Sequence, residues 1–157
     1  MVLEITKHLD KPHVISYWRD NDTKTWMYAD DFFVRHDLSH YAIESKLGYT
    51  SAFMGMLNNG IDIQDFADRE KKNKMIVSKQ ARYSEGMANL FLIEIEQGEI
   101  ENFNDVMKEI FEISDDKLDA PVLSEDELVG IRTCLRQLYK AWSELPVNET
   151  MSLPIKL

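Results

Sequence analysis

The residues best suited to chemistry lie in one short segment, where two histidines and a glutamate recur at a spacing of four: His36, His40 and Glu44. In an α-helix, residues at this spacing fall about 40° apart around the axis, so the three side chains form one stripe. Large hydrophobic side chains share the same arc of this helix, namely Phe32, Phe33, Ile43 and Leu47. We therefore expect the helix to turn its polar trio towards the protein core.

Burial of these three polar side chains requires partners, because each unsatisfied group costs roughly 1–3 kcal/mol. One explanation is a transition metal: two imidazoles one turn apart can chelate zinc or iron, with Glu44 as a third ligand. A second is a metal-free site in which a histidine acts as a general acid or base. A third is a structural role, with the imidazoles hydrogen-bonded to each other, to Glu44 or to the backbone. Metal binding is the leading hypothesis.

Two further acids belong to the candidate site. Asp37 lies at the rim of the arc and could orient an imidazole, so Asp37 and Glu44 are the candidate catalytic residues. Glu94 lies within an apolar stripe of a long helix expected over about residues 70–97, and we expect it to complete a metal-ligand set of His36, His40, Glu44 and Glu94. Glu85 falls on a side of that helix that we expect to face solvent.

Residues 36–40, His-Asp-Leu-Ser-His, resemble the HDxxH metal-ligand pattern of a ubiquinone-biosynthesis family. That family places a glutamate twelve residues after the second histidine, where this sequence has Ala52. The first two residues of the segment are also similar to the His-Asp pair of HD-domain phosphohydrolases, which are all-helical and use further helical His and Asp ligands. The remaining histidines, His8 and His13, fall in an expected sheet and are only reserve ligands, so neither resemblance implies a substrate or a reaction.

The elements that position these residues begin with a small sheet. Residues 1–29 lack a helical period and contain β-branched and aromatic clusters separated by turn formers, which predicts an antiparallel β meander. A helix is expected over about residues 31–47. An aspartate at 30 or 31 would cap its start, and Gly48 would end it.

The remainder of the chain is expected to be helical. The pattern predicts short helices near residues 51–57 and 62–68, the long helix closed by Gly98, and an amphipathic helix from Phe103 to Phe111. The last helix should begin at the capping box of Ser124 and Glu127. We predict a single α+β domain, predominantly helical, in which a small N-terminal antiparallel sheet packs against about four or five helices. Its parts are the meander (1–29), the helical region (30–145) and a tail (146–157) able to return as a strand.

Composition limits the partners. The 157 residues carry 18 Lys+Arg against 28 Asp+Glu, a formal net charge of -10, which disfavours nucleic acid and anionic membranes. The charged N-terminus and the lack of an 18-residue apolar run predict neither a signal peptide nor a membrane span. The single cysteine, Cys134, cannot form an intramolecular disulfide, so we expect a cytoplasmic protein.

Two functions from different classes remain open. The leading hypothesis is a metal-binding protein, with zinc or iron as the candidate ion, that acts as a metal-dependent hydrolase on an unidentified small molecule. The alternative is a non-enzymatic interaction protein with structural histidines, a homodimer joined through the helix at residues 128–145. Apolar residues alternate at steps of three and four along that helix, but the run covers only about two and a half heptads, which favours core packing.

Overall fold

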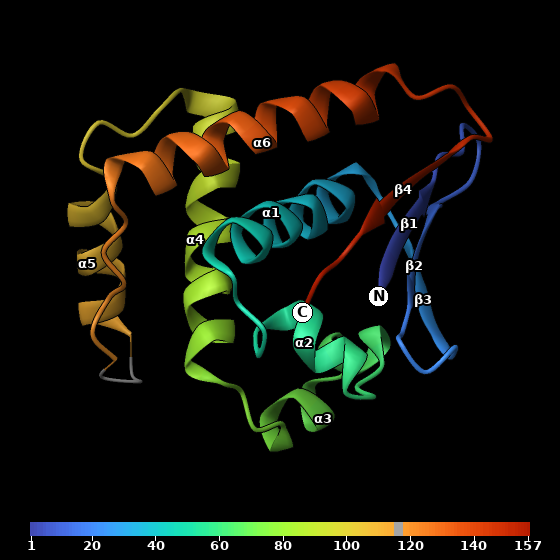
Figure 1. The fold of residues 1–157 in the computed structure, drawn as a ribbon, viewed down its shortest axis with the longest axis horizontal. Coiled ribbons are helices and arrows are strands. Elements are labelled where there is room, and N and C mark those ends of the chain that lie inside the picture. Colours follow the sequence, from blue (N-terminus) through green and yellow to red (C-terminus); the bar gives the residue numbers. More distant parts are fainter. Residues whose placement is uncertain (115–117) are drawn as a thin grey trace.

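A computed structural model describes residues 1–114 and 118–157 of the chain and has the expected α+β architecture (Figure 1). Four strands form one sheet: β1 (Val2–Thr6), β2 (His13–Trp18), β3 (Lys24–Ala29) and β4 (Thr150–Pro154). The helices are α1 (Asp31–Leu47), α2 (Phe53–Asn58), α3 (Arg69–Lys74), α4 (Lys79–Gln97), α5 (Phe103–Ile113) and α6 (Glu125–Glu144), with a 3-10 turn at Ile63–Phe66.

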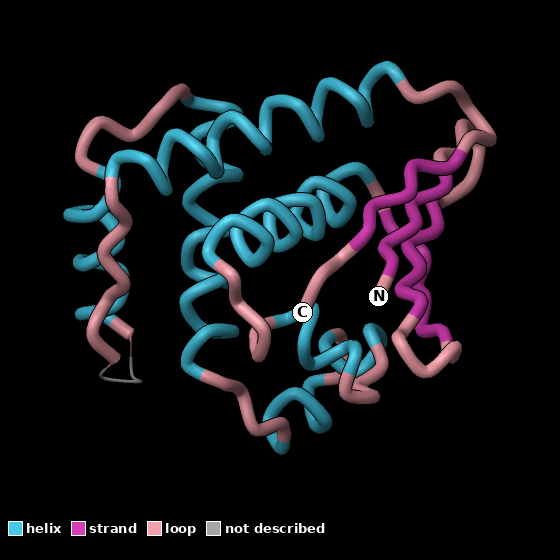
Figure 2. Tube along the Cα trace, in the orientation of Figure 1, coloured by secondary structure: helices cyan, strands magenta, loops and turns pink. Residues whose placement is uncertain are grey.

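The sheet is antiparallel throughout, with the strand order β3-β2-β1-β4 (Figure 2). Ile5 of β1 lies opposite Ile15 of β2 on one side and Met151 of β4 on the other. Alternate side chains of β1 and β2 are fully buried on the face that meets the helices, as the period of two in a half-buried strand requires. The expected meander is confirmed, and the C-terminal tail returns to it as β4.

Helix α1 occupies the middle of the molecule, with α4 crossing it, α6 running along it and the sheet beyond its N-terminus (Figure 1). Its boundaries follow the predicted signals. Asp30 accepts a hydrogen bond from the Phe33 backbone N–H, and Gly48 takes the left-handed conformation at φ 64° that a residue without Cβ adopts most easily. Because neighbours surround it, α1 can bury polar as well as apolar side chains.

The predicted long helix over 70–97 is wrong, because the chain leaves the helical conformation between α3 and α4. Met75 is extended, and the hydroxyl of Ser78 accepts a hydrogen bond from the Ala81 N–H to cap α4. A serine side chain that bonds to the backbone favours a helix start over an uninterrupted helix. The sequence has no proline or glycine here that would have indicated the break. Ile76 is 94% exposed, so the apolar residues of this link do not belong to a helical stripe.

Helix α6 begins at the predicted capping box of Ser124 and Glu127 and packs against α1. Its apolar row is buried within the single chain: Leu128, Ile131, Leu135, Leu138 and Trp142. This face of α6 therefore packs in the core, as the shortness of the heptad run favoured. Within residues 1–114 and 118–157, no helix combines the length and hydropathy needed to cross a bilayer.

Candidate metal site

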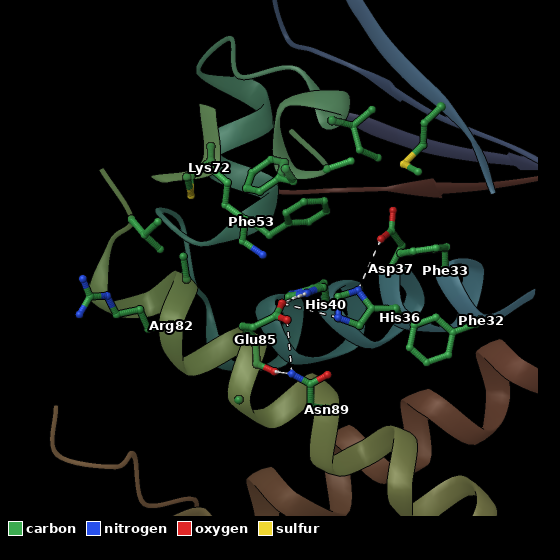
Figure 3. Close-up of a pocket in the computed structure, with 18 of the residues that line it drawn as sticks. Phe32, Phe33, His36, Asp37, His40, Phe53, Lys72, Arg82, Glu85 and Asn89 are labelled. Carbon is green, nitrogen blue, oxygen red and sulfur yellow. Dashed lines mark hydrogen bonds and ion pairs between the residues drawn. The ribbon is translucent and has the colours of Figure 1, made fainter. Parts of the chain in front are cut away.

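Helices α1 and α4 bring two imidazoles and one carboxylate together (Figure 3). The Nε2 atom of His40 lies 3.2 Å from Oε2 of Glu85, and the Nε2 atom of His36 lies 3.5 Å from the same oxygen. One ligand atom from each of the three residues can be chosen so that all lie within 4.8 Å of one another. His40 is buried, His36 is largely buried, and the side chain of Glu85 is 54% exposed.

Glu85 reaches the histidines because α4 presents small side chains to α1. Ala81, Ser84 and Ala88 are buried and recur at steps of three and four, so they lie on one side of α4. Short side chains allow two helix backbones to approach closely. Glu85, at the edge of this small-residue stripe, can then extend its carboxylate across to the polar stripe of α1.

The Nδ1 atom of His40 faces a second, buried carboxylate. It lies 3.2 Å from Oε1 of Glu44 and 2.8 Å from the hydroxyl of Ser84. Glu44 also accepts hydrogen bonds from the Ser84 hydroxyl (2.7 Å) and from the backbone N–H groups of Phe53 (3.2 Å) and Met54 (2.8 Å). With both of its oxygens engaged, Glu44 is positioned to hold the ring of His40 from behind.

His36 has a similar arrangement. Its Nδ1 atom lies 3.9 Å from Oδ1 of the buried Asp37, whose other oxygen accepts a hydrogen bond of 2.8 Å from the Tyr17 hydroxyl. Each imidazole therefore has a buried carboxylate near Nδ1 and the carboxylate of Glu85 near Nε2.

These contacts control protonation. Burial by itself lowers the pKa of His40, but hydrogen bonds with Glu44 and Glu85 outweigh it and raise the pKa to about 10. Burial also opposes the charged form of His36, yet its interactions with Asp37 and Glu85 raise that pKa as well. Hydrogen bonds from the two histidines hold the pKa of Glu85 well below its usual range. Without an ion, protons shared between imidazoles and carboxylates stabilise the cluster.

The same atoms have spacings suited to a metal ion. Metal–ligand bonds of about 2.1 Å place neighbouring ligand atoms of a tetrahedral site about 3.4 Å apart. The two distances from Oε2 of Glu85 to the imidazoles, 3.2 and 3.5 Å, are close to this separation. Two imidazoles and a carboxylate suit zinc or ferrous iron, and carboxylates on the far side of metal-bound imidazoles are a recurring way to orient them.

The cluster lies in the wall of a cavity of about 670 Å³, a volume within the range of small-molecule sites. The polar side chains of its lining are those of the cluster and four others: His36, Asp37, His40, Glu85, Lys72, Arg82, Asn89 and Ser114. Most other lining side chains are apolar and come from α1, α2, the 3-10 turn, α4 and α5, among them Phe32, Phe33, Phe53, Phe66, Ile63 and Phe111. An ion held by the cluster would therefore face a largely apolar chamber.

The structure brings together four of the residues singled out from the sequence and places the fifth elsewhere. His36 and His40 face each other, with Asp37 and Glu44 behind them. Glu94 lies on another side of α4, where it accepts hydrogen bonds of 2.6 and 3.1 Å from Arg132 and one of 3.0 Å from the Ile100 N–H. The reserve histidines also lie elsewhere: at the β1–β2 turn, the backbone N–H of His8 donates a hydrogen bond of 3.0 Å to Nδ1 of His13.

Glu85 is the residue that sequence reasoning missed. We expected Glu85 to face solvent, and this is partly correct: its side chain is half exposed and lies at the edge of the buried face of α4. The available signal was the neighbouring stripe of Ala81, Ser84 and Ala88, whose small side chains mark the face where another helix approaches.

Comparison of the chain with models of protein families, with curated proteins and with solved structures finds no match. The function must therefore be argued from the chemistry of the site.

Proposed function

We propose that this protein binds a divalent transition metal through His36, His40 and Glu85, and that it is a hydrolase acting on a small molecule in the adjoining cavity. The observation that carries the proposal is the convergence of three ligand atoms from two helices, within 4.8 Å of one another, on the wall of that cavity. Zinc and ferrous iron are the ions that this ligand set favours.

The proposal gives each nearby acid a distinct role. Glu85 is the third ligand, because the distances from its Oε2 atom to the two imidazole Nε2 atoms match the separation of neighbouring ligand atoms around one metal ion. Glu44 and Asp37 are positioning residues that hold the rings of His40 and His36 by their Nδ1 sides. A bound ion with an open coordination position supplies a Lewis acid and lowers the pKa of its water to about 7. Glu94 has no part in this proposal, because Arg132 and the Ile100 N–H occupy its carboxylate.

The metal content of protein purified without a chelating tag tests whether the protein binds a metal ion. Elemental analysis should find zinc or iron at close to one equivalent in the wild type and almost none in a His36→Ala/His40→Ala variant. A His8→Ala/His13→Ala variant removes the same number of imidazoles from outside the cluster and should keep the ion. Circular dichroism checks that each variant is folded. Metal-free wild type that also takes up no added zinc would refute the proposal.

Ester hydrolysis tests whether the metal-loaded protein is a hydrolase. Zinc-loaded protein should cleave p-nitrophenyl esters faster than the same protein after dialysis against a chelator, and Glu85→Gln should abolish the difference. A protein that holds one equivalent of metal but shows no metal-dependent turnover of esters, amides or phosphate esters would be a metal-binding protein without hydrolase activity.

The alternative is a non-enzymatic interaction protein with structural histidines, and one observation favours it. In residues 1–114 and 118–157, every buried side-chain nitrogen and oxygen already has a hydrogen-bond partner, so the cluster is satisfied by protons alone. This alternative expects no metal uptake at neutral pH. In its homodimer form it also expects a mass of about twice 18.3 kDa in light scattering.

A further inference from the structure

The wall of the cavity carries a continuous series of aromatic contacts, and the two imidazoles lie in the middle of it. Ring centroids are 4.9 Å apart for Phe66 and Phe53, 4.9 Å for Phe53 and His40, and 4.7 Å for His40 and His36. The series continues from His36 to Phe32 at 6.3 Å. All five rings line the cavity.

The direction of the series follows from α1. Phe32, His36 and His40 are four residues apart, just over one turn, so they succeed one another along the helix axis at steps of about 6 Å. Phe53 of α2 then lies beside His40, at the end away from Phe32 (Figure 3). Phenylalanines therefore flank the imidazole pair on both sides.

The rings at one end of the series are accessible to solvent. Phe32 is 56% exposed and Phe33 is 47% exposed, although both line the cavity. They contact each other at 5.5 Å. Large apolar side chains left accessible on a concave surface are a feature of binding sites, because a ligand can cover them.

From this arrangement we infer the class of ligand: an elongated molecule with a polar bond in its interior and an apolar, preferably aromatic, group on each side. One group would pack on Phe53 and Phe66, and the other on Phe32 and Phe33. The bond between them, an ester or amide, would then lie over His36 and His40. The position of the reacting bond rests on the proposed function, whereas the two apolar contacts depend only on the cavity.

Three amides that differ only in their aromatic groups test the inference. N-benzylphenylacetamide carries a ring on both sides of the amide, whereas N-benzylacetamide and N-methylphenylacetamide each lack one of them. Calorimetric titration of zinc-loaded protein should give the two-ring amide an affinity about tenfold higher than either one-ring amide, since burial of a further ring is worth at least about 1.4 kcal/mol.

Substitutions at the two ends locate the groups. Phe32→Ala and Phe66→Ala should each reduce the affinity for the two-ring amide by about tenfold, and each should leave one of the one-ring amides nearly unchanged. Tyr28→Ala is the matched control, because Tyr28 is an exposed aromatic residue of β3 outside the cavity lining. Equal affinities for all three amides, or variants at both ends that bind like the wild type, would overturn the inference.

The same titrations separate this inference from the proposed function. Each sample is analysed for metal, and the titrations are repeated after removal of metal by a chelator. Preference for the two-ring amide in protein that never binds zinc would support the ligand class and refute the metal site. Stoichiometric zinc with no preference for two rings would refute the ligand class and leave the metal site standing.

Discussion

Two glutamates of helix α4, Glu85 and Glu94, lie nine residues apart and enter contrasting environments. Glu94 pairs with Arg132 at 2.6 Å, and both side chains are almost fully buried. Glu85 pairs with His36 and His40 beside a cavity. A guanidinium stays protonated at any ordinary pH, whereas an imidazole can exchange its proton for a metal ion. The partner of each carboxylate therefore distinguishes a structural ion pair from a candidate site.

The largest expected effect concerns the metal. His40→Ala removes one of three protein ligands, and we expect zinc affinity to fall by at least about a thousandfold, or about 4 kcal/mol. Competition with a fluorescent zinc chelator measures the affinity. Glu94→Gln should leave it within about twofold of the wild type. If both variants bound zinc as tightly as the wild type, the cluster of His40 and Glu85 would not be the zinc site, and its contrast with the Glu94–Arg132 pair would disappear.

Stability should show the reverse pattern. Glu94→Ala leaves the buried guanidinium of Arg132 without its main partner, so we expect the free energy of unfolding to drop by about 3 kcal/mol in urea denaturation. Glu99→Ala is the matched control, because Glu99 is exposed and lies 3.6 Å from the same guanidinium. Its loss should cost less than about 1 kcal/mol. A larger loss from Glu99→Ala than from Glu94→Ala would contradict the structural role of Glu94.

The two clusters should also differ in their response to pH. The pKa of His40 rises from 6.5 to about 10 on folding, so its stabilising contribution is complete below pH 6.5 and is lost as the pH rises through 10. For one proton, the slope is at most about 1.4 kcal/mol per pH unit. Unfolding of metal-free protein between these values should show this decline, and His40→Gln should reduce it. Glu94→Gln should not, since Arg132 does not titrate there.

The smallest expected effect concerns the carboxylate behind His40. Glu44→Gln keeps the shape of the side chain but removes its charge, and we expect zinc affinity to fall by about tenfold. The affinity is again measured by competition with the chelator, and circular dichroism checks the fold. Zinc binding as tight as in the wild type would remove Glu44 from the positioning role. A loss as large as that of His40→Ala would instead favour Glu44 as a direct ligand.

Much of the fold follows from local signals in the sequence. The β-branched and aromatic clusters of 1–29 and the turn formers between them indicate the strands. The cap at Asp30, Gly48 and the capping box at Ser124 specify helix boundaries through residues close in the chain. The shared face of His36, His40 and Glu44 is equally local, because a rotation of about 100° per residue fixes it. These features could therefore be predicted from the sequence alone.

Only the tertiary structure decided which acid meets the histidines. Glu85 and Glu94 are both acids near an apolar stripe of α4, and the choice depends on how α4 docks on α1 and on the break at Ser78 that frees it from α3. The cavity likewise exists only when five helices, the 3-10 turn and β3 surround it. Helical periodicity specifies which side chains share a face, but contacts between faces arise from packing among residues far apart in the chain.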